Sequence, residues 1–272
     1  MANFIFRPGR FEGPWQDVPW LIDETQKHYD AHITPKGLGD RFSVAAEKIV
    51  KARKWEPSLS LIKPNLDSVI RELEIFYVPK QMDPGPAIVF PLRDHHNKIR
   101  HAQLKPFYEL TGRSGPMKYS RLGKGRSPIT WFGDRDPTLL SIGKYSSVML
   151  VEGYFDLLAC RLLHPTAPIL STGTKKMNDV HLWYLQMLGV KTIHLMFDNE
   201  IAKEGKDEGA GNQAARFVAQ QFQGQGGVEF QIQACPATDP SACLEDKRTA
   251  YHLRSMLHRR FPVESAVDED LD

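Results

Sequence analysis

The chain has 272 residues, of which 41% are hydrophobic and 25% are charged, values typical of a globular protein with a substantial core. No apolar run approaches the roughly 18 residues of a membrane helix, and the first residues carry no apolar signal core, so we expect a cytoplasmic protein without a membrane partner. The three cysteines form no C-x-x-C pair, which argues against a disulfide framework and against a zinc ribbon.

The net charge of +2 hides a polarised chain. Residues 95–131 contain eight Lys or Arg and one acid, whereas residues 264–272 contain five acids and no base. The basic segment favours a polyanionic partner, with a solvated surface loop as the alternative. For the acidic tail we expect a disordered, solubilising segment, and a docking role is the alternative.

The first half of the chain predicts short elements of mixed type. Its first forty residues are rich in Pro, Gly and aromatic residues, which indicates irregular structure. Beyond them, apolar periodicity predicts helices and alternation predicts strands. In chain order these are helices at 42–54 and 65–74, strands at 74–79 and 87–92, a turn at 94–97 and a hairpin partner at 98–105.

After about residue 143 strands and helices alternate regularly. Strands are expected at 148–151, 169–171, 192–197 and 228–232, with helices at 155–164, 178–188 and 212–222 between them. This order predicts an α/β fold whose mostly parallel sheet is flanked by helices and is preceded by a smaller mixed α+β subdomain. The expected domains are a basic subdomain at 1–142, the sheet domain at 143–246, and a C-terminal helix with the acidic tail at 247–272.

Acidic residues follow three of the expected strands. Glu152 follows the first, Asp198 and Glu200 follow the third, and Asp239 lies just beyond the fourth. The carboxyl ends of parallel strands meet at one edge of a sheet, where ligands bind. Carboxylates gathered there repel one another unless a hard cation joins them, and oxygen ligands without Cys or His favour Mg²⁺ or Mn²⁺ over zinc.

Each acid also has a simpler interpretation. An isolated acid after a strand is most often a helix cap or a turn residue. Asp156 can merely complement a helix dipole, and Asp239 before Pro240 can be a turn residue. Gly153 would let the backbone turn sharply from strand to helix and would allow a ligand to approach closely.

Four segments resemble the motifs of the TOPRIM domain in its primase form. Residues 151–156 (VEGYFD) are similar to its glutamate motif and residues 197–200 (FDNE) to its D-x-D motif. Residues 170–174 (LSTGT) resemble the loop between those motifs, and residues 238–241 (TDPS) resemble the later DPD element. The four occur in the family's order across most of residues 145–246.

Three upstream segments extend the resemblance to DnaG-type primases of bacteria and phages. These are residues 74–79, 89–94 (VFPLRD) and 118–120 (KYS). Topoisomerases and nucleases share the TOPRIM domain, so the upstream segments favour a primase.

The resemblance implies a DNA primase catalytic core, of the kind that phages or other mobile elements encode, acting in the bacterial host cytoplasm. It would copy a single-stranded DNA template into a short RNA from ribonucleoside triphosphates. Glu152, Asp198 and Glu200 would be catalytic and, with Asp239, would hold Mg²⁺ or Mn²⁺, and no zinc is expected. Gly153 and Asp156 would support these ligands. The residues expected to bind nucleotide or DNA are Arg93, Lys105, Lys118, Tyr119 and Arg121.

The sequence departs from the family pattern at several points. Glu200 stands where the second acid of D-x-D is usually Asp, and the insertion 201–209 leaves Asp207 and Glu208 as competitors for that role. Lys105 replaces a usual arginine, and Arg121 replaces a usual asparagine. The chain shows neither the amino-terminal zinc ribbon nor a G-x-x-x-x-G-K-[ST] phosphate loop, so a helicase or a separate zinc-binding module is a possible partner.

Two other functions stay open from the sequence. A metal-dependent TOPRIM nuclease would use the same acids to activate water on a phosphodiester. A non-catalytic module derived from a primase would bind single strands without turnover.

Overall fold

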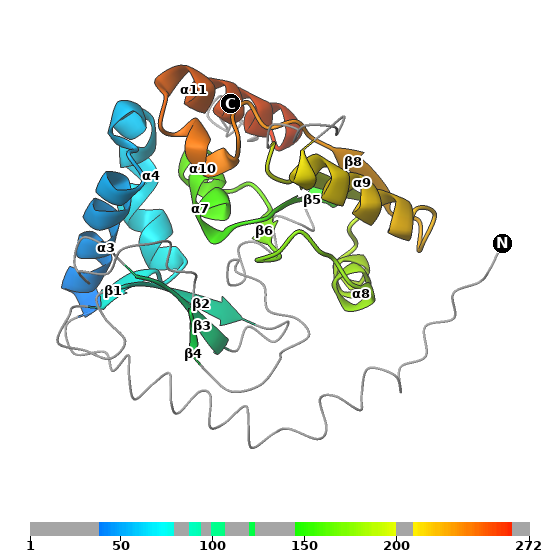
Figure 1. The fold of residues 1–272 in the computed structure, drawn as a ribbon, viewed down its shortest axis with the longest axis horizontal. Coiled ribbons are helices and arrows are strands. Elements are labelled where there is room, and N and C mark those ends of the chain that lie inside the picture. Colours follow the sequence, from blue (N-terminus) through cyan, green and yellow to red (C-terminus); the bar gives the residue numbers. More distant parts are fainter. Residues whose placement is uncertain are drawn as a thin grey trace, which may run out of the picture.

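Two β-sheets and the helices around them make up the fold (Figure 1). The computed structural model describes residues 38–78, 87–93, 99–106, 120–122, 145–199 and 209–262. The elements before residue 145 are α3 (Leu38–Ala52), η1 (Glu56–Ser58), α4 (Leu59–Glu72), β1 (Phe76–Val78), β2 (Ala87–Arg93), β3 (Ile99–Pro106) and β4 (Ser120–Leu122). Those after it are β5 (Ser147–Val151), α7 (Tyr154–Leu163), β6 (Ile169–Ser171), α8 (Asp179–Met187), β7 (Thr192–Met196), α9 (Ala210–Phe222), β8 (Glu229–Ile232), α10 (Pro240–Cys243) and α11 (Lys247–Arg260).

The second sheet is wholly parallel and has the strand order β6-β5-β7-β8. Every residue of β5 is buried, because successive side chains enter different cores. Met149 and Val151 belong to a core that includes residues of α7, α10 and α11, whereas Val148 and Leu150 belong to a core with residues of α8 and α9. Helices therefore cover both faces of the sheet, as its continuous apolar strand predicted.

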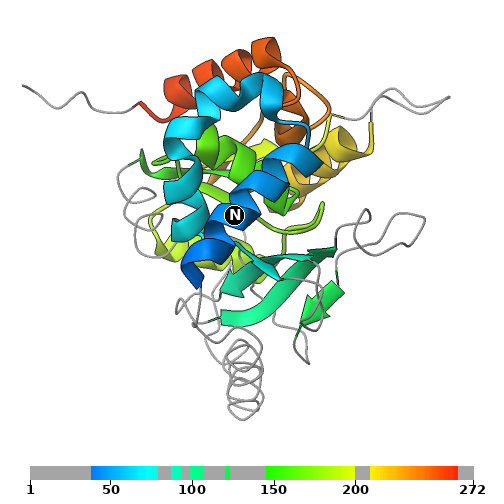
Figure 2. The same ribbon diagram turned by 90° about the vertical axis from the view of Figure 1, so that its left-hand side faces the viewer.

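The first sheet is antiparallel, in the order β1-β2-β3-β4, and packs on the beginning of α7 (Figure 2). Phe90 of β2 stacks on the ring of Tyr154 at 5.8 Å between centroids and meets the ring of Phe155 edge-on at 5.0 Å. Ile88 and Phe90 share a core with α3, α4 and α7. The small sheet thus lies next to the turn where β5 leads into α7.

The fold class is confirmed, and the differences from the expected elements are local. Helix α4 begins at Leu59 rather than at 65 and contains Pro64. Burial of Leu61 and Ile62 stabilises the earlier turn strongly enough to include the proline. Strand β4 was missed because its three residues show no apolar alternation. No helix in the described ranges is both long and apolar enough to cross a bilayer.

Part of the sequence-based organisation lies outside the described residues. Residues 1–37 of the segment expected to be irregular are not described. The turn at 94–97, the acidic tail and the domain boundary at 142/143 also lie outside the described residues. One hydrophobic core contains residues from both sides of that boundary. The division into three domains stays a prediction.

Two buried histidines lead us to expect a loss of stability in mild acid. Burial lowers the pKa of His181 to about 4, and burial together with Arg260 lowers the pKa of His194 to about 4. Both rings stay neutral in the folded protein while the unfolded chain takes up protons below about pH 6.5, so the free energy of unfolding falls from about pH 6.5 to about 4.

Urea unfolding at a series of pH values measures this effect. Because other groups titrate in the same range, the comparison is with His194→Gln, whose amide stays uncharged beside Gln233. We expect the variant to lose less stability than the parent chain between pH 7 and about 4.5. Identical pH profiles for the two proteins would contradict the assignment.

Candidate active site

The strand order of the parallel sheet reverses between β5 and β7. From β5 the chain moves to β6 on one side and then crosses to β7 on the other. In open α/β sheets, ligands bind beyond the carboxyl ends of the strands at such a switch point. Val151 of β5 pairs with Met196 of β7, so Glu152 and Asp198 follow neighbouring strand ends. The topology therefore places these two acids at the edge where a ligand is expected.

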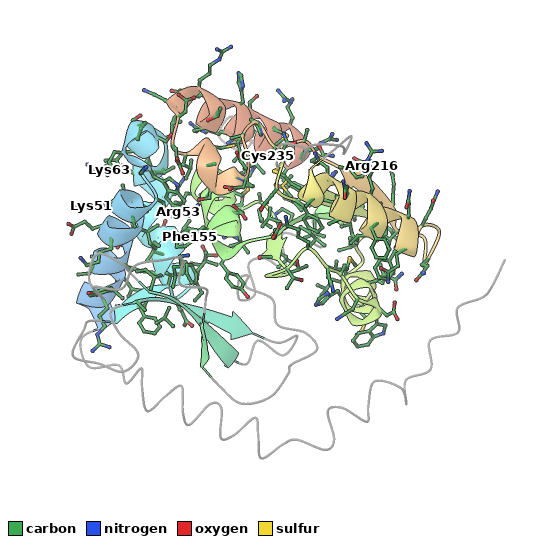
Figure 3. All side chains as sticks on the ribbon, viewed as in Figure 1. Lys51, Arg53, Lys63, Phe155, Arg216 and Cys235 are labelled. Carbon is green, nitrogen blue, oxygen red and sulfur yellow. The ribbon has the colours of Figure 1, made fainter. Side chains whose placement is uncertain are left out.

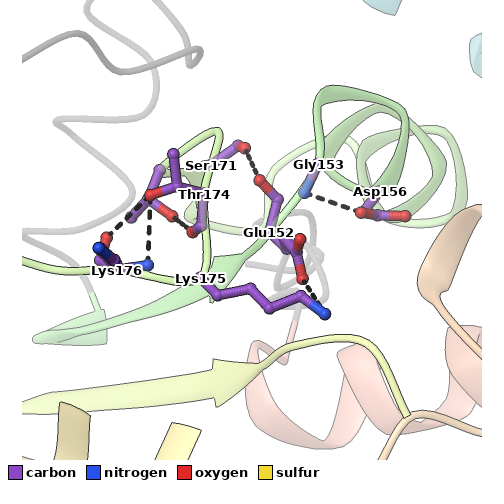
Figure 4. Close-up of polar contacts among 8 residues, drawn as sticks. Glu152, Gly153, Asp156, Ser171, Thr174, Lys175 and Lys176 are labelled. Atoms are coloured by element: carbon purple, nitrogen blue, oxygen red, sulfur yellow. Dashed lines mark hydrogen bonds and ion pairs between the residues drawn. The ribbon is translucent and has the colours of Figure 1, made fainter. Parts of the chain in front are cut away.

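The carboxylate of Glu152 lies beside a lysine from the loop after β6 (Figure 4). The Nζ atom of Lys175 is 3.7 Å from Oε2 of Glu152, and both side chains are partly buried. The hydroxyl of Ser171, at the end of β6, donates a hydrogen bond of 2.9 Å to the backbone oxygen of Glu152. This bond ties the 170–174 loop to the end of β5 and holds Lys175 near the acid.

Asp156 joins three elements at the start of α7. Its Oδ2 accepts from the backbone N–H of Gly153 at 2.8 Å, and its Oδ1 accepts from the backbone N–H of Ser241 at 3.2 Å. Gly153 has φ −100° and ψ 160°, an extended conformation open to any residue. A Cβ atom at position 153 would lie 2.5 Å from Oδ2 of Asp156, so a larger residue would displace this carboxylate from its hydrogen bond. The absence of a side chain, rather than a sharp turn, explains Gly153.

Asp156 is buried close to two other acids. Burial is the main cause that raises the pKa of Asp156 to about 8, and the nearby carboxylates of Asp239 and Asp198 raise it further. The two backbone hydrogen bonds act in the opposite direction. Asp198 and Asp239, which follow two other strands, are therefore close enough to Asp156 to raise its pKa, as expected for a site that receives a cation.

The backbone of Asp198 is in tight contact with the beginning of α9. A Cβ atom on Gly211 would overlap the carbonyl oxygen of Asp198 and would lie 2.9 Å from its backbone nitrogen. Beside it, the Nδ2 group of Asn212 donates to Oδ1 of Asn199 at 3.0 Å, and the Nδ2 group of Asn199 donates to the backbone oxygen of Cys235 at 3.3 Å. Helix α9 and the segment after β8 thus fix the position of Asp198.

Asp239 is the N-cap of the short helix α10. Its Oδ1 accepts from the backbone N–H of Ala242 at 2.6 Å. One carboxylate oxygen of Asp239 therefore caps a helix, which is the simpler interpretation of an acid after a strand. Its charge nevertheless acts on Asp156, so the cap is also part of the acidic cluster.

Arg53 connects the acidic cluster to the side of the antiparallel sheet, because it donates to Ser241, whose backbone N–H donates to Asp156. Arg53, which follows α3, donates from Nε to the hydroxyl of Ser241 at 3.0 Å, and its guanidinium lies 4.9 Å from the centroid of the Phe155 ring (Figure 3). Lys105 of β3 is partly buried, and burial followed by the charge of Arg53 lowers its pKa. The structure thus brings the predicted Lys105 close to an arginine that sequence reasoning missed. Arg53 stands in the basic run 51–54, which looks like an ordinary helix end.

Several predicted site residues lie outside the described part of the chain. These are Glu200, Lys118 and Tyr119, together with the competing acids Asp207 and Glu208. For Arg93 and Arg121 the structure describes the backbone alone: Arg93 ends β2, and position 121 of β4 pairs with position 103 of β3. Their assignment to nucleotide or DNA binding stays a prediction.

The described residues are compatible with a magnesium ion held largely through water. No group of three His, Cys, Asp or Glu residues in the described ranges has the spacing of a complete ligand set. Mg²⁺ usually keeps several waters and binds one or two protein carboxylates. Glu152 and Asp198 can supply these two carboxylates. The pKa of Asp156 is raised first by burial and then by the charges of Asp239 and Asp198, and a cation beside these acids would reduce the second effect.

Comparison with known proteins identifies the fold. No family model and no curated protein matches the sequence. The RNA polymerase domain of Mycobacterium tuberculosis primase DnaG, in complex with double-stranded DNA, matches with a TM-score of 0.55 and 18% identity, over 81% of this chain and 78% of that one.

Two further solved structures agree with that match. The DnaG primase catalytic domain bound to single-stranded DNA has a TM-score of 0.54 and 14% identity, with 87% of this chain and 80% of that one covered. The Aquifex aeolicus primase, with its zinc-binding and RNA polymerase domains, has a TM-score of 0.53 and 17% identity, with 87% and 60% covered. The chain therefore has the fold of the DnaG primase catalytic core, as its motifs implied.

Proposed function

We propose that the protein is a DNA primase that synthesises short RNA primers on single-stranded DNA by Mg²⁺-dependent nucleotidyl transfer. The observation that carries this proposal is the acidic cluster at the switch point of the parallel sheet. Asp198 and Asp239 both raise the pKa of Asp156, and Glu152 directly follows β5. The fold shared with primase catalytic cores makes template copying the best-supported use of such a cluster.

In this proposal each group has a distinct task. Glu152 and Asp198 would hold Mg²⁺ or Mn²⁺, with Glu200 and Asp239 as further ligands. A bound divalent cation supplies charge neutralisation and alignment of the attacking and leaving oxygens in phosphoryl transfer. Asp156 would hold the start of α7 next to α10, because its carboxylate accepts from the backbone N–H groups of Gly153 and Ser241.

The basic side chains would bind the substrates. Arg53 contacts Ser241 beside Asp156, and Lys105 lies close to Arg53, so the two cations would neutralise the phosphates of an incoming ribonucleotide. Arg93, Lys118, Tyr119 and Arg121 extend this basic region in the proposal and would contact the template or the triphosphate.

The ion pair between Lys175 and Glu152 predicts how a divalent cation binds. The ammonium group of Lys175 neutralises Glu152 in the absence of a metal, so a cation that binds Glu152 has to displace it. We expect Lys175→Gln to bind Mn²⁺ roughly 3- to 10-fold more tightly than the parent chain. Mn²⁺ then no longer has to break a partly exposed ion pair, which contributes about 1 kcal/mol.

Mn²⁺ titration followed by electron paramagnetic resonance measures that affinity without any turnover. Lys176→Gln, at an exposed neighbouring position, is the matched control. Weaker Mn²⁺ binding in Lys175→Gln than in the control would contradict this role of the lysine.

Primer synthesis itself tests the proposed function. The protein is incubated with single-stranded templates of varied sequence, labelled ribonucleotides and Mg²⁺ or Mn²⁺, and the products are sized on a gel. We expect short RNA products that require template, ribonucleotides and metal. Cleavage of DNA in the absence of nucleotides would instead indicate a nuclease, and DNA binding without any product would indicate a non-catalytic module.

A further inference from the structure

Helix α11 has an unusual charge composition. Its 14 residues contain five Lys or Arg, two His and no acid. Surface helices normally carry acids one turn away from their bases, because such pairs stabilise the helix. In α11 no base has such a partner within the helix; along the chain, the acids next to it are Glu245 and the N-cap Asp246 before it and Glu264 after it.

The basic residues gather on one face of α11. Ala250, Leu253 and Leu257 are fully buried and anchor the opposite face in the core that includes α7 and α10. The exposed positions on the outer face include Lys247, Arg248, Tyr251, His252, Arg254, Ser255 and Arg259. From the first to the last of these the helix rises by about 18 Å, so the cations form a stripe rather than a point.

The stripe is not neutralised by the rest of the described structure. Within the described ranges, Lys247, Arg248, Arg254 and Arg259 make no ion pair, and Arg259 donates only to the hydroxyl of Ser255, at 2.9 Å. Four uncompensated cations along one helix face attract an extended polyanion.

An aromatic side chain interrupts the stripe. Tyr251 lies between the cations on the exposed face, and 49% of its surface is accessible to solvent. Alternation of basic and aromatic side chains is typical of surfaces that bind single-stranded nucleic acids, where cations contact phosphates and rings stack on unpaired bases.

We propose that the outer face of α11 is a second binding surface for single-stranded DNA. It is separate from the antiparallel sheet that carries Lys105, because α7 and α10 lie between that sheet and α11 (Figure 1). The surface binds the strand through its phosphates and through Tyr251, independently of sequence, and so holds template outside the site of synthesis. This inference rests on the proposed function only for the choice of single-stranded DNA as the partner.

A binding measurement without nucleotides or Mg²⁺ tests the proposal independently of catalysis. Fluorescence anisotropy of a labelled oligothymidylate is followed in EDTA at salt concentrations from about 50 to 200 mM. The test variant combines Arg248→Gln, Arg254→Gln and Arg259→Gln. The control variant combines Lys51→Gln, Lys63→Gln and Lys191→Gln, three exposed lysines outside α11, so the change in net charge is the same.

We expect the α11 variant to reduce the slope of log affinity against log salt by about 2, because each single-strand phosphate contact contributes about 0.7. The control variant should keep the parent slope. Tyr251→Ala should weaken binding roughly 10-fold with an unchanged slope, as stacking does not release counterions.

Three results would overturn the proposal. Equal slopes in the α11 and control variants would show that only net charge matters. Parent-like affinity in both the α11 variant and Tyr251→Ala would show that the face binds another partner. Loss of affinity for a duplex of the same length, with oligothymidylate binding intact, would show that the partner is not single-stranded.

Discussion

Asp198→Asn is expected to abolish primer synthesis while the protein stays folded. The substitution removes the carboxylate that follows β7, next to the end of β5, and leaves an isosteric amide that binds Mg²⁺ poorly. Loss of the charge stabilisation that a bound cation provides corresponds to about 4 kcal/mol, or about a 1,000-fold lower rate.

The thermal midpoint separates this effect from unfolding. Asp198 raises the pKa of the buried Asp156, so removal of its charge relieves repulsion, and the midpoint without metal should be unchanged or higher. Asp179→Asn, in the exposed first turn of α8, is the matched control and should synthesise primers at the parent rate. Near-normal synthesis by Asp198→Asn would remove this acid from the site.

Gly211→Ala is expected to reduce both stability and synthesis. The added Cβ atom would overlap the carbonyl oxygen of Asp198, and a backbone atom cannot move aside as a flexible side chain can. Overpacking of this kind costs about 1 to 3 kcal/mol. Helix α9 has to shift away from β7 or Asp198 has to move, and a displacement of about 1 Å at a catalytic group lowers the rate about 100-fold.

Gln220→Ala provides the comparison on the same helix. Gln220 is exposed on α9, so alanine there should leave the free energy of unfolding within about 0.5 kcal/mol of the parent value. Denaturant unfolding and the primer assay are measured for both variants. A Gly211→Ala protein as stable and as active as Gln220→Ala would show that α9 does not press on Asp198.

The sequence predicted those parts of the fold that depend on local pattern. The buried run at 148–151 and the alternation of strands and helices after it led to the parallel sheet. Helix α4 was predicted to begin too late, because the burial of Leu61 and Ile62 that stabilises its first turns is a tertiary effect.

The candidate site was predictable in its acids but not in its contacts. Glu152, Asp198 and Asp239 stand out because each follows a strand. Arg53 follows a helix in a basic run, and only the tertiary fold brings it to Ser241 and close to Lys105. The bond from Ser241 to Asp156 spans 85 residues, a distance at which sequence pattern carries no signal.

The central claim is that carboxylates from separate strands share a divalent cation. A crystal structure of the protein soaked in Mn²⁺, with an anomalous difference map, tests it most directly. The account predicts a manganese peak bounded by the carboxylates of Glu152 and Asp198, with Lys175 withdrawn from Glu152. Carboxylates that point apart with no peak between them would contradict the claim.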